Sequence, residues 1–114
     1  MPHIALPPNK PGMIALSAYR SDVYSRLASL ADLLLHQDQP DSTLTLGKRE
    51  LIAAYVSSLN DCSYCQTAHG SMAAAHLQDA KLVEDVKSNF ESSEVSPKMK
   101  ALLRIAVWFS GAER

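Results

Sequence analysis

Residues 45–70 read TLGKRELIAAYVSSLNDCSYCQTAHG, a segment that predicts two helices joined by a short turn. Thr45 can accept a backbone N–H of the exposed first turn, so it is the expected start of the first helix. Apolar residues then recur at intervals of three and four, which is typical of a helix with one buried face. The expected core stripe consists of Leu51, Ala54, Tyr55 and Leu59.

The first of these helices is predicted to end near Asn60. Asn60 and Asp61 are residue types that cap helices, so a second helix is expected to begin at once. It is predicted to carry Cys62 in its first turn and to continue to about His76. A turn this short allows the two helices to pack as a hairpin.

The N-terminal part of the chain divides into an arm and a helix. Four prolines and a glycine within residues 1–12 prevent a long helix and predict an extended arm. Ser21 is the predicted N-cap of a helix whose end is marked by residues 36–42, HQDQPDS. The apolar residues of that helix at helical spacing are Val23, Leu27, Leu30, Ala31 and Leu34. The leucines, with Met72 and Met99, are expected in the core.

Two further helices are predicted near the C-terminus. A short one occupies roughly Asp79 to Lys87 and is followed by a loop over residues 89–97, NFESSEVSP. The last helix has Ser96 as its cap and Pro97 at its first position, and it ends before Gly111. Its predicted apolar face consists of Met99, Leu102, Leu103, Ala106 and Phe109.

These elements predict an all-α fold. No stretch alternates polar and apolar residues long enough to require a strand, and residues 42–46, STLTL, are the one candidate. We expect a single domain over residues 1–114, with an extended arm over 1–12 and helices over 21–111.

Composition narrows the class of function. The chain has 114 residues, of which 46% are hydrophobic and 20% charged, as in globular proteins. Eleven basic and twelve acidic residues give a net charge of −1 without a basic cluster, so neither nucleic acid nor an anionic membrane is an expected partner. A secretory signal is not recognisable in residues 1–16, and a cytoplasmic location is expected.

The cysteine pair predicts redox or metal chemistry. Cys62 and Cys65 are the only cysteines, and in a reducing compartment such a pair is more often reactive than structural. On an α-helix Cys62 and Cys65 lie about 60° apart, and His69 lies about 40° from Cys65. A helix start favours the thiolate, and the imidazole of His69 can exchange its proton.

Other interpretations of these residues remain open. The cysteines could be two buried small side chains, or they could bind zinc together with His69, although a structural zinc site needs four ligands. The remaining histidines are His3 in the arm and His36 and His76 at predicted helix ends. Glu50, on the preceding helix, could orient His69 across the hairpin or could be a solvated acid of a first turn.

The spacing from Glu50 through Cys62 and Cys65 to His69, E-x11-C-x2-C-x3-H, resembles the signature of AhpD-like alkylhydroperoxidases in the carboxymuconolactone decarboxylase superfamily. The arm MPHIALPPNKPG and residues 44–70 are most similar to the subgroup described as peroxidase-related enzymes. The resemblance implies an AhpD-like helical bundle with the CxxC motif at the N-terminus of a central helix.

The resemblance also implies an activity, namely hydroperoxide reduction by a redox-active Cys62–Cys65 disulfide pair. An external dithiol, lipoyl-like or thioredoxin-like, would reduce the pair again, in a homo-oligomer that needs no metal, haem or flavin. Cys65 would be the attacking thiolate, Cys62 the resolving thiol, and His69 with Glu50 the proton relay. Placement at the helix start instead favours Cys62 as the more acidic thiol.

Family members usually continue with further helices beyond residues 106–114, AVWFSGAER, so the resemblance implies that this chain lacks the C-terminal helices. The exposed face of the last helix, with Trp108 and Phe109, would then need a partner. Two alternatives to the peroxidase are a non-catalytic module in which the cysteine pair senses redox state and controls assembly, and a lactone enzyme of the decarboxylase branch. The decarboxylase reaction does not need a redox dithiol.

Overall fold

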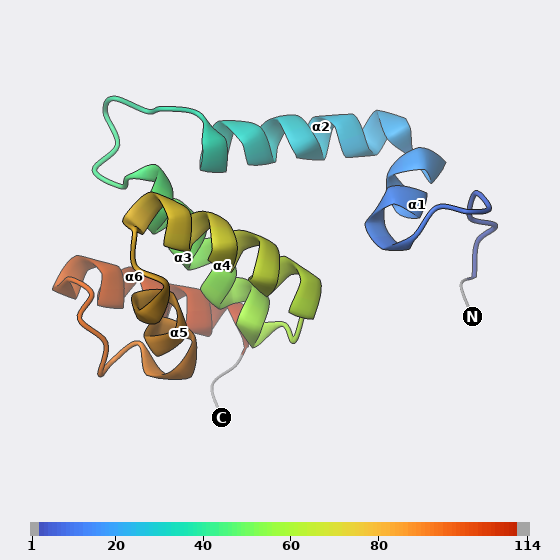
Figure 1. Cartoon of the computed structure of the whole chain (residues 1–114). Helices are drawn as coiled ribbons and strands as arrows, with labels where there is room; N and C mark the ends of the chain where they lie inside the picture. Colours follow the sequence, from blue (N-terminus) through green and yellow to red (C-terminus); the bar gives the residue numbers. More distant parts are fainter. Residues whose placement is uncertain (1–2, 112–114) are drawn as a thin grey trace. The chain divides into compact units, whose positions relative to one another are not determined.

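The computed structural model describes residues 3–111, and all regular secondary structure in this range is helical (Figure 1). The chain divides into two compact units, residues 1–37 and residues 38–114. The all-α prediction is confirmed. Within the described residues no helix is long and apolar enough to cross a membrane.

The first unit consists of α1 (Gly12–Tyr19), α2 (Ser21–Ala31) and a π-helical continuation, η1 (Asp32–His36). Residues 3–11 form no helix, as expected for the proline-rich arm, whereas α1 was not anticipated. Its first residue, Gly12, has φ +51°, a conformation that glycine adopts readily. The helix predicted from residue 21 is confirmed, and it ends where Gln37 becomes extended.

The start of α2 differs from the prediction. Arg20, and not Ser21, occupies the N-cap position, and no side chain caps the helix. The Arg20 guanidinium instead donates two hydrogen bonds to the Asp22 carboxylate, at 2.9 and 2.8 Å. These bonds lower the pKa of Asp22 to about 2. Asp22 thereby stays ionised in the first turn, where a negative charge favours the helix.

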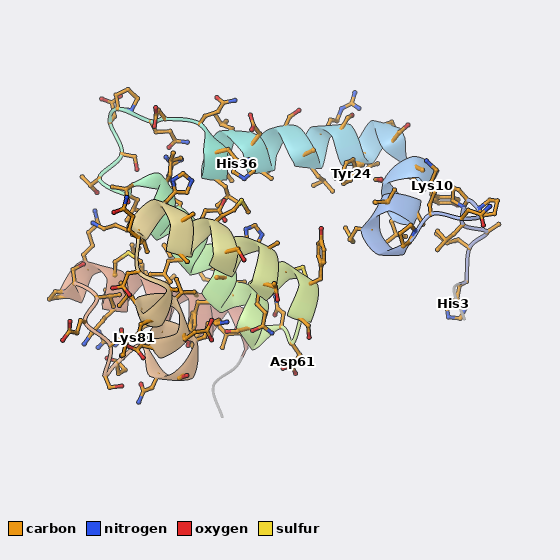
Figure 2. All side chains as sticks on the ribbon, in the orientation of Figure 1. His3, Lys10, Tyr24, His36, Asp61 and Lys81 are labelled. Carbon is orange, nitrogen blue, oxygen red and sulfur yellow. A yellow bond between two sulfur atoms is a disulfide. The ribbon has the colours of Figure 1, made fainter. Side chains whose placement is uncertain are left out.

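The leucines of α2 were expected in the core, and this expectation is wrong. Among residues 3–37 only Ala15 is buried. The apolar residues that recur at helical spacing along α2 and η1 are exposed. These residues include Val23, Leu27, Leu30 and Leu34. Figure 2 shows the side chains of α2 and η1, with Tyr24 labelled on α2 and His36 on η1. Helical periodicity locates an apolar face but does not say what covers it.

The second unit is built on an antiparallel hairpin of α3 (Leu46–Leu59) and α4 (Ser63–Leu77), seen in Figure 1. Thr45 caps α3 as predicted, because its hydroxyl accepts the backbone N–H of Lys48 at 3.4 Å. Gly47 permits close approach at the open end of the hairpin. A Cβ there would lie 2.8 Å from the side chain of Leu77 and 3.0 Å from Cβ of His76.

Two helices complete this unit, α5 (Ala80–Asn89) and α6 (Pro97–Ser110). Asp79 caps α5, and Ser96 caps α6 with Pro97 at its first position, so both predicted helices are confirmed. The helix α3 packs against α4, α5 and α6. The buried apolar cluster consists of Leu51, Tyr55, Ala73, Val83, Val86, Phe90, Met99 and Leu103.

Two aromatic residues depart from their predicted positions. Phe90 lies in the predicted loop, but it is buried and packs edge-to-face on Tyr55 with ring centroids 5.4 Å apart. Phe109 was placed on the core face of the last helix, but it is 78% exposed. At about 100° per residue, Phe109 falls at the margin of the stripe centred on Leu103. Trp108 is exposed as expected.

Glycine substitutions test the hairpin. Gly47→Ala should lower the free energy of unfolding by about 1–2 kcal/mol, because the added methyl group overpacks the contact with Leu77. Gly70→Ala is the matched control: its Cβ would meet Val83 at an ordinary 3.6 Å, so the better helix former should stabilise the protein by roughly 0.5–1 kcal/mol. Urea unfolding measures both, and stabilisation by Gly47→Ala would contradict the close approach.

Candidate active site

The turn between α3 and α4 is a Schellman motif. The N–H of Cys62 donates to the carbonyl of Ser57 at 3.0 Å, and the N–H of Asp61 donates to that of Ser58 at 3.2 Å. Asp61 has φ +52°, the left-handed conformation that this motif requires. The motif reverses the chain within three residues, and Figure 2 labels Asp61 at this turn.

Cys62 is the N-cap of α4 and does not lie in its first turn, which corrects the prediction. Its backbone is extended, with φ −87° and ψ 91°, since the Schellman motif releases the chain at this residue. Its Sγ accepts the backbone N–H of Cys65 at 3.3 Å. The helical angle between the two cysteines therefore does not apply, and the cap is what brings the sulfurs together.

Cys62 and Cys65 form a disulfide with their Cα atoms 5.3 Å apart, within the usual range for such a bond. Both residues are half-buried. Cys65 lies in the first turn of α4, and His69 follows one turn later, so these side chains are neighbours on the helix surface.

Glu50 and His69 meet across the hairpin. His69 Nδ1 lies 2.7 Å from Glu50 Oε2, a hydrogen-bond distance. The Glu50 side chain is only 1% exposed, which rules out a solvated acid, and the His69 side chain is 26% exposed. A bond at Nδ1 orients the ring and leaves Nε2 as the nitrogen available for proton exchange.

This arrangement can move electrons and protons at one place. A dithiol formed from Cys62 and Cys65 can close to a disulfide across a single cap, because their Cα atoms already lie at the required distance. An imidazole one turn away can accept or return a proton, and a buried carboxylate holds that imidazole in one orientation.

The remaining histidines are His76 on α4, His36 on η1 and His3 in the arm. His76 is exposed in the last turn of α4, about 16 Å along the helix from Cys65. His36 lies in η1 beside Asp32, with 3.4 Å between Nδ1 and Oδ1, and His3 lies in the non-helical arm. Among residues 3–111 no group of three His, Cys, Asp or Glu side chains is placed to hold a metal ion.

Tyr64, beside the cysteines, was expected to be a packing residue rather than a catalytic one, and the structure shows that it does not pack in the core. It follows the N-cap by two positions, and 76% of it is exposed. On a helical wheel Tyr64 points away from the cysteine face, which argues against a catalytic role. The wheel does not predict that its ring is exposed to solvent beside the disulfide.

Comparison with known proteins gives two matches. The sequence model of the carboxymuconolactone decarboxylase family matches residues 21–108. The fold is similar to the crystal structure of an uncharacterised peroxidase-related protein from Ralstonia eutropha JMP134, described as an alkylhydroperoxidase AhpD core, with 26% sequence identity and a TM-score of 0.72. The match covers 90% of this chain and 53% of that one, so this chain spans about half the length of that relative. No curated protein matches.

Substitutions at Asp61 test the turn. The free energy of unfolding of the Asp61→Gly variant should be about 1 kcal/mol higher than that of Asp61→Ala, because glycine adopts the left-handed conformation without a clash of Cβ. Chemical denaturation of both variants measures the difference. Equal stability of the two variants would show that residue 61 does not hold this conformation in solution.

A double-mutant cycle tests the pair of Glu50 and His69. Glu50→Ala, His69→Ala and the double variant should reveal a coupling of about 1–3 kcal/mol, because either single change deprives a hydrogen-bonded, largely buried group of its partner. Unfolding free energies of the four proteins give the coupling. Strict additivity would mean that the two side chains do not interact.

Proposed function

The chain belongs to the carboxymuconolactone decarboxylase family, and from this membership together with the geometry at Cys62 we propose that it is a hydroperoxide reductase of the AhpD-like type. The observation that carries the proposal is the buried Glu50 carboxylate, 2.7 Å from His69, one helical turn from a CxxC disulfide. A buried carboxylate and a histidine are not needed for a structural disulfide. They are needed where a thiol must lose and regain a proton.

In the proposed reaction the Cys65 thiolate attacks the terminal oxygen of the hydroperoxide. The O–O bond breaks, the alkoxide leaves and takes a proton through His69, and Cys65 becomes a sulfenic acid. The thiol of Cys62 then attacks the Cys65 sulfur, releasing water and forming the disulfide. An external dithiol reduces this disulfide with two electrons and two protons.

Each residue has a role in this proposal that follows from its position. Cys65 is the attacking group because it lies one turn from His69, and Cys62 is the resolving thiol because the cap holds it beside Cys65. His69 transfers the proton, and Glu50 orients it. No step in this sequence requires a metal, haem or flavin. The redox dithiol favours this activity over the lactone chemistry of the decarboxylase branch.

We further propose that the protein works as a homo-oligomer in the cytoplasm. Residues 3–37 expose a row of large apolar side chains and bury little, and units of fewer than about 40 residues rarely fold alone. The exposed Trp108 and Phe109 on α6 give the second unit a similar need for a partner.

Peroxide turnover with dithiothreitol as reductant tests the function. Cys62→Ser and Cys65→Ser should each abolish turnover, and His69→Ala should reduce kcat/KM by about 10²–10⁴-fold, the usual contribution of a positioned proton-transfer group. Ser71→Ala, an exposed change on the same helix, is the matched control and should retain full activity.

Undiminished peroxide consumption by the double-serine variant would refute the proposal. If no variant or wild type turned over peroxide while oxidation changed the oligomer size in gel filtration, a redox-sensing assembly module would be the better description.

A further inference from the structure

Tyr64 presents an aromatic ring to solvent beside the disulfide. It is 76% exposed, whereas the cysteines on either side of Ser63 and Tyr64 are half-buried. Tyr64 lies in the first turn of α4, directly before Cys65. The other residues flanking the cysteines at this turn, Asp61 and Ser63, are small or polar and also exposed.

Reduction of the disulfide requires the reductant to contact these flanking residues. A disulfide is reduced when a thiolate attacks one sulfur and a mixed disulfide forms. During that step a protein reductant is covalently joined to this chain, so its surface must contact the residues that flank the attacked sulfur. Because both cysteines are half-buried, the exposed flanking residues are the ones that meet the partner first.

The cap identifies which sulfur is attacked. Cys62 Sγ accepts the backbone N–H of Cys65 at 3.3 Å and lies at the positive end of α4, so negative charge on this sulfur is stabilised as it leaves. The incoming thiolate therefore attacks Cys65, the bond between the two sulfurs breaks, and Cys62 departs as a thiolate. A second thiol of the reductant then attacks the mixed disulfide, which releases Cys65 and leaves the reductant oxidised. Two electrons and two protons pass to this chain.

We propose that Tyr64 is the docking residue for a protein dithiol of the thioredoxin type, in which the reactive cysteine lies within an apolar surface. This proposal rests on the proposed function, in which the disulfide is reduced by an external dithiol. From residue 51 to residue 78 the only Asp, Glu, Lys or Arg is Asp61, so the segment around the disulfide offers the partner little charge. Exposed tyrosines supply large contact areas at low entropic cost and are enriched among the residues that dominate interfaces.

Reduction of the oxidised protein, without peroxide, tests the proposal. The second-order rate constant is measured with reduced thioredoxin and, separately, with dithiothreitol, by following the appearance of thiols. Tyr64→Ser should slow reduction by thioredoxin about tenfold, which corresponds to the loss of one anchoring contact. Tyr64→Phe, which keeps the ring, and Ser71→Ala, farther along α4, should leave that rate unchanged.

The small dithiol serves as the internal control. Dithiothreitol needs no docking surface, so Tyr64→Ser should be reduced by it at the wild-type rate, and raised ionic strength should not alter the thioredoxin rate. An unchanged thioredoxin rate in Tyr64→Ser, equal slowing with both reductants, or wild-type protein that thioredoxin reduces no faster than dithiothreitol would each overturn the proposal. Since no peroxide is present, a failure of the peroxidase function would leave this result intact.

Discussion

The Glu50 carboxylate is buried where α3 meets α4, and a buried carboxylate must be hydrogen-bonded because its desolvation otherwise costs several kcal/mol. His69 lies at 2.7 Å and provides that partner. The register of the hairpin and the orientation of the imidazole therefore depend on the same contact. Any sliding of one helix along the other would separate the pair, so the stability of the hairpin and the geometry of the candidate site are linked.

The turn between α3 and α4 provides hydrogen-bond partners for the backbone groups at two helix ends with few residues. The Schellman motif that ends α3 and the cap that begins α4 share Cys62, whose N–H serves the first helix and whose sulfur serves the second. A serine could cap the helix equally well. Cysteine at this position also allows the disulfide with Cys65, and it places the sulfur at the positive end of α4.

All four residues of the candidate site belong to the unit of residues 38–114, and to one hairpin within it. The buried cluster formed with α5 and α6 supports that hairpin from outside the site. Apart from Tyr64, most of the exposed large apolar residues lie on other elements, namely α1, α2, η1 and α6. Chemistry and proposed assembly thus use different parts of the chain, as expected where a rigid hairpin holds the reacting groups.

The sequence by itself determined the all-α class, the limits of α3, α5 and α6 to within about two residues, and the spacing that brings Cys65 and His69 onto one helix face. These features are local, since caps and periodicity act within a few residues. Only the tertiary structure decided that Glu50 is buried against His69, that Phe90 enters the core, and that the leucines of α2 and Phe109 stay exposed. Burial depends on which other element covers a face, and a local pattern does not contain that information. The position of Cys62 outside the first turn of α4 likewise follows from two motifs that share this residue, the Schellman motif and the cap, and neither motif alone predicts it.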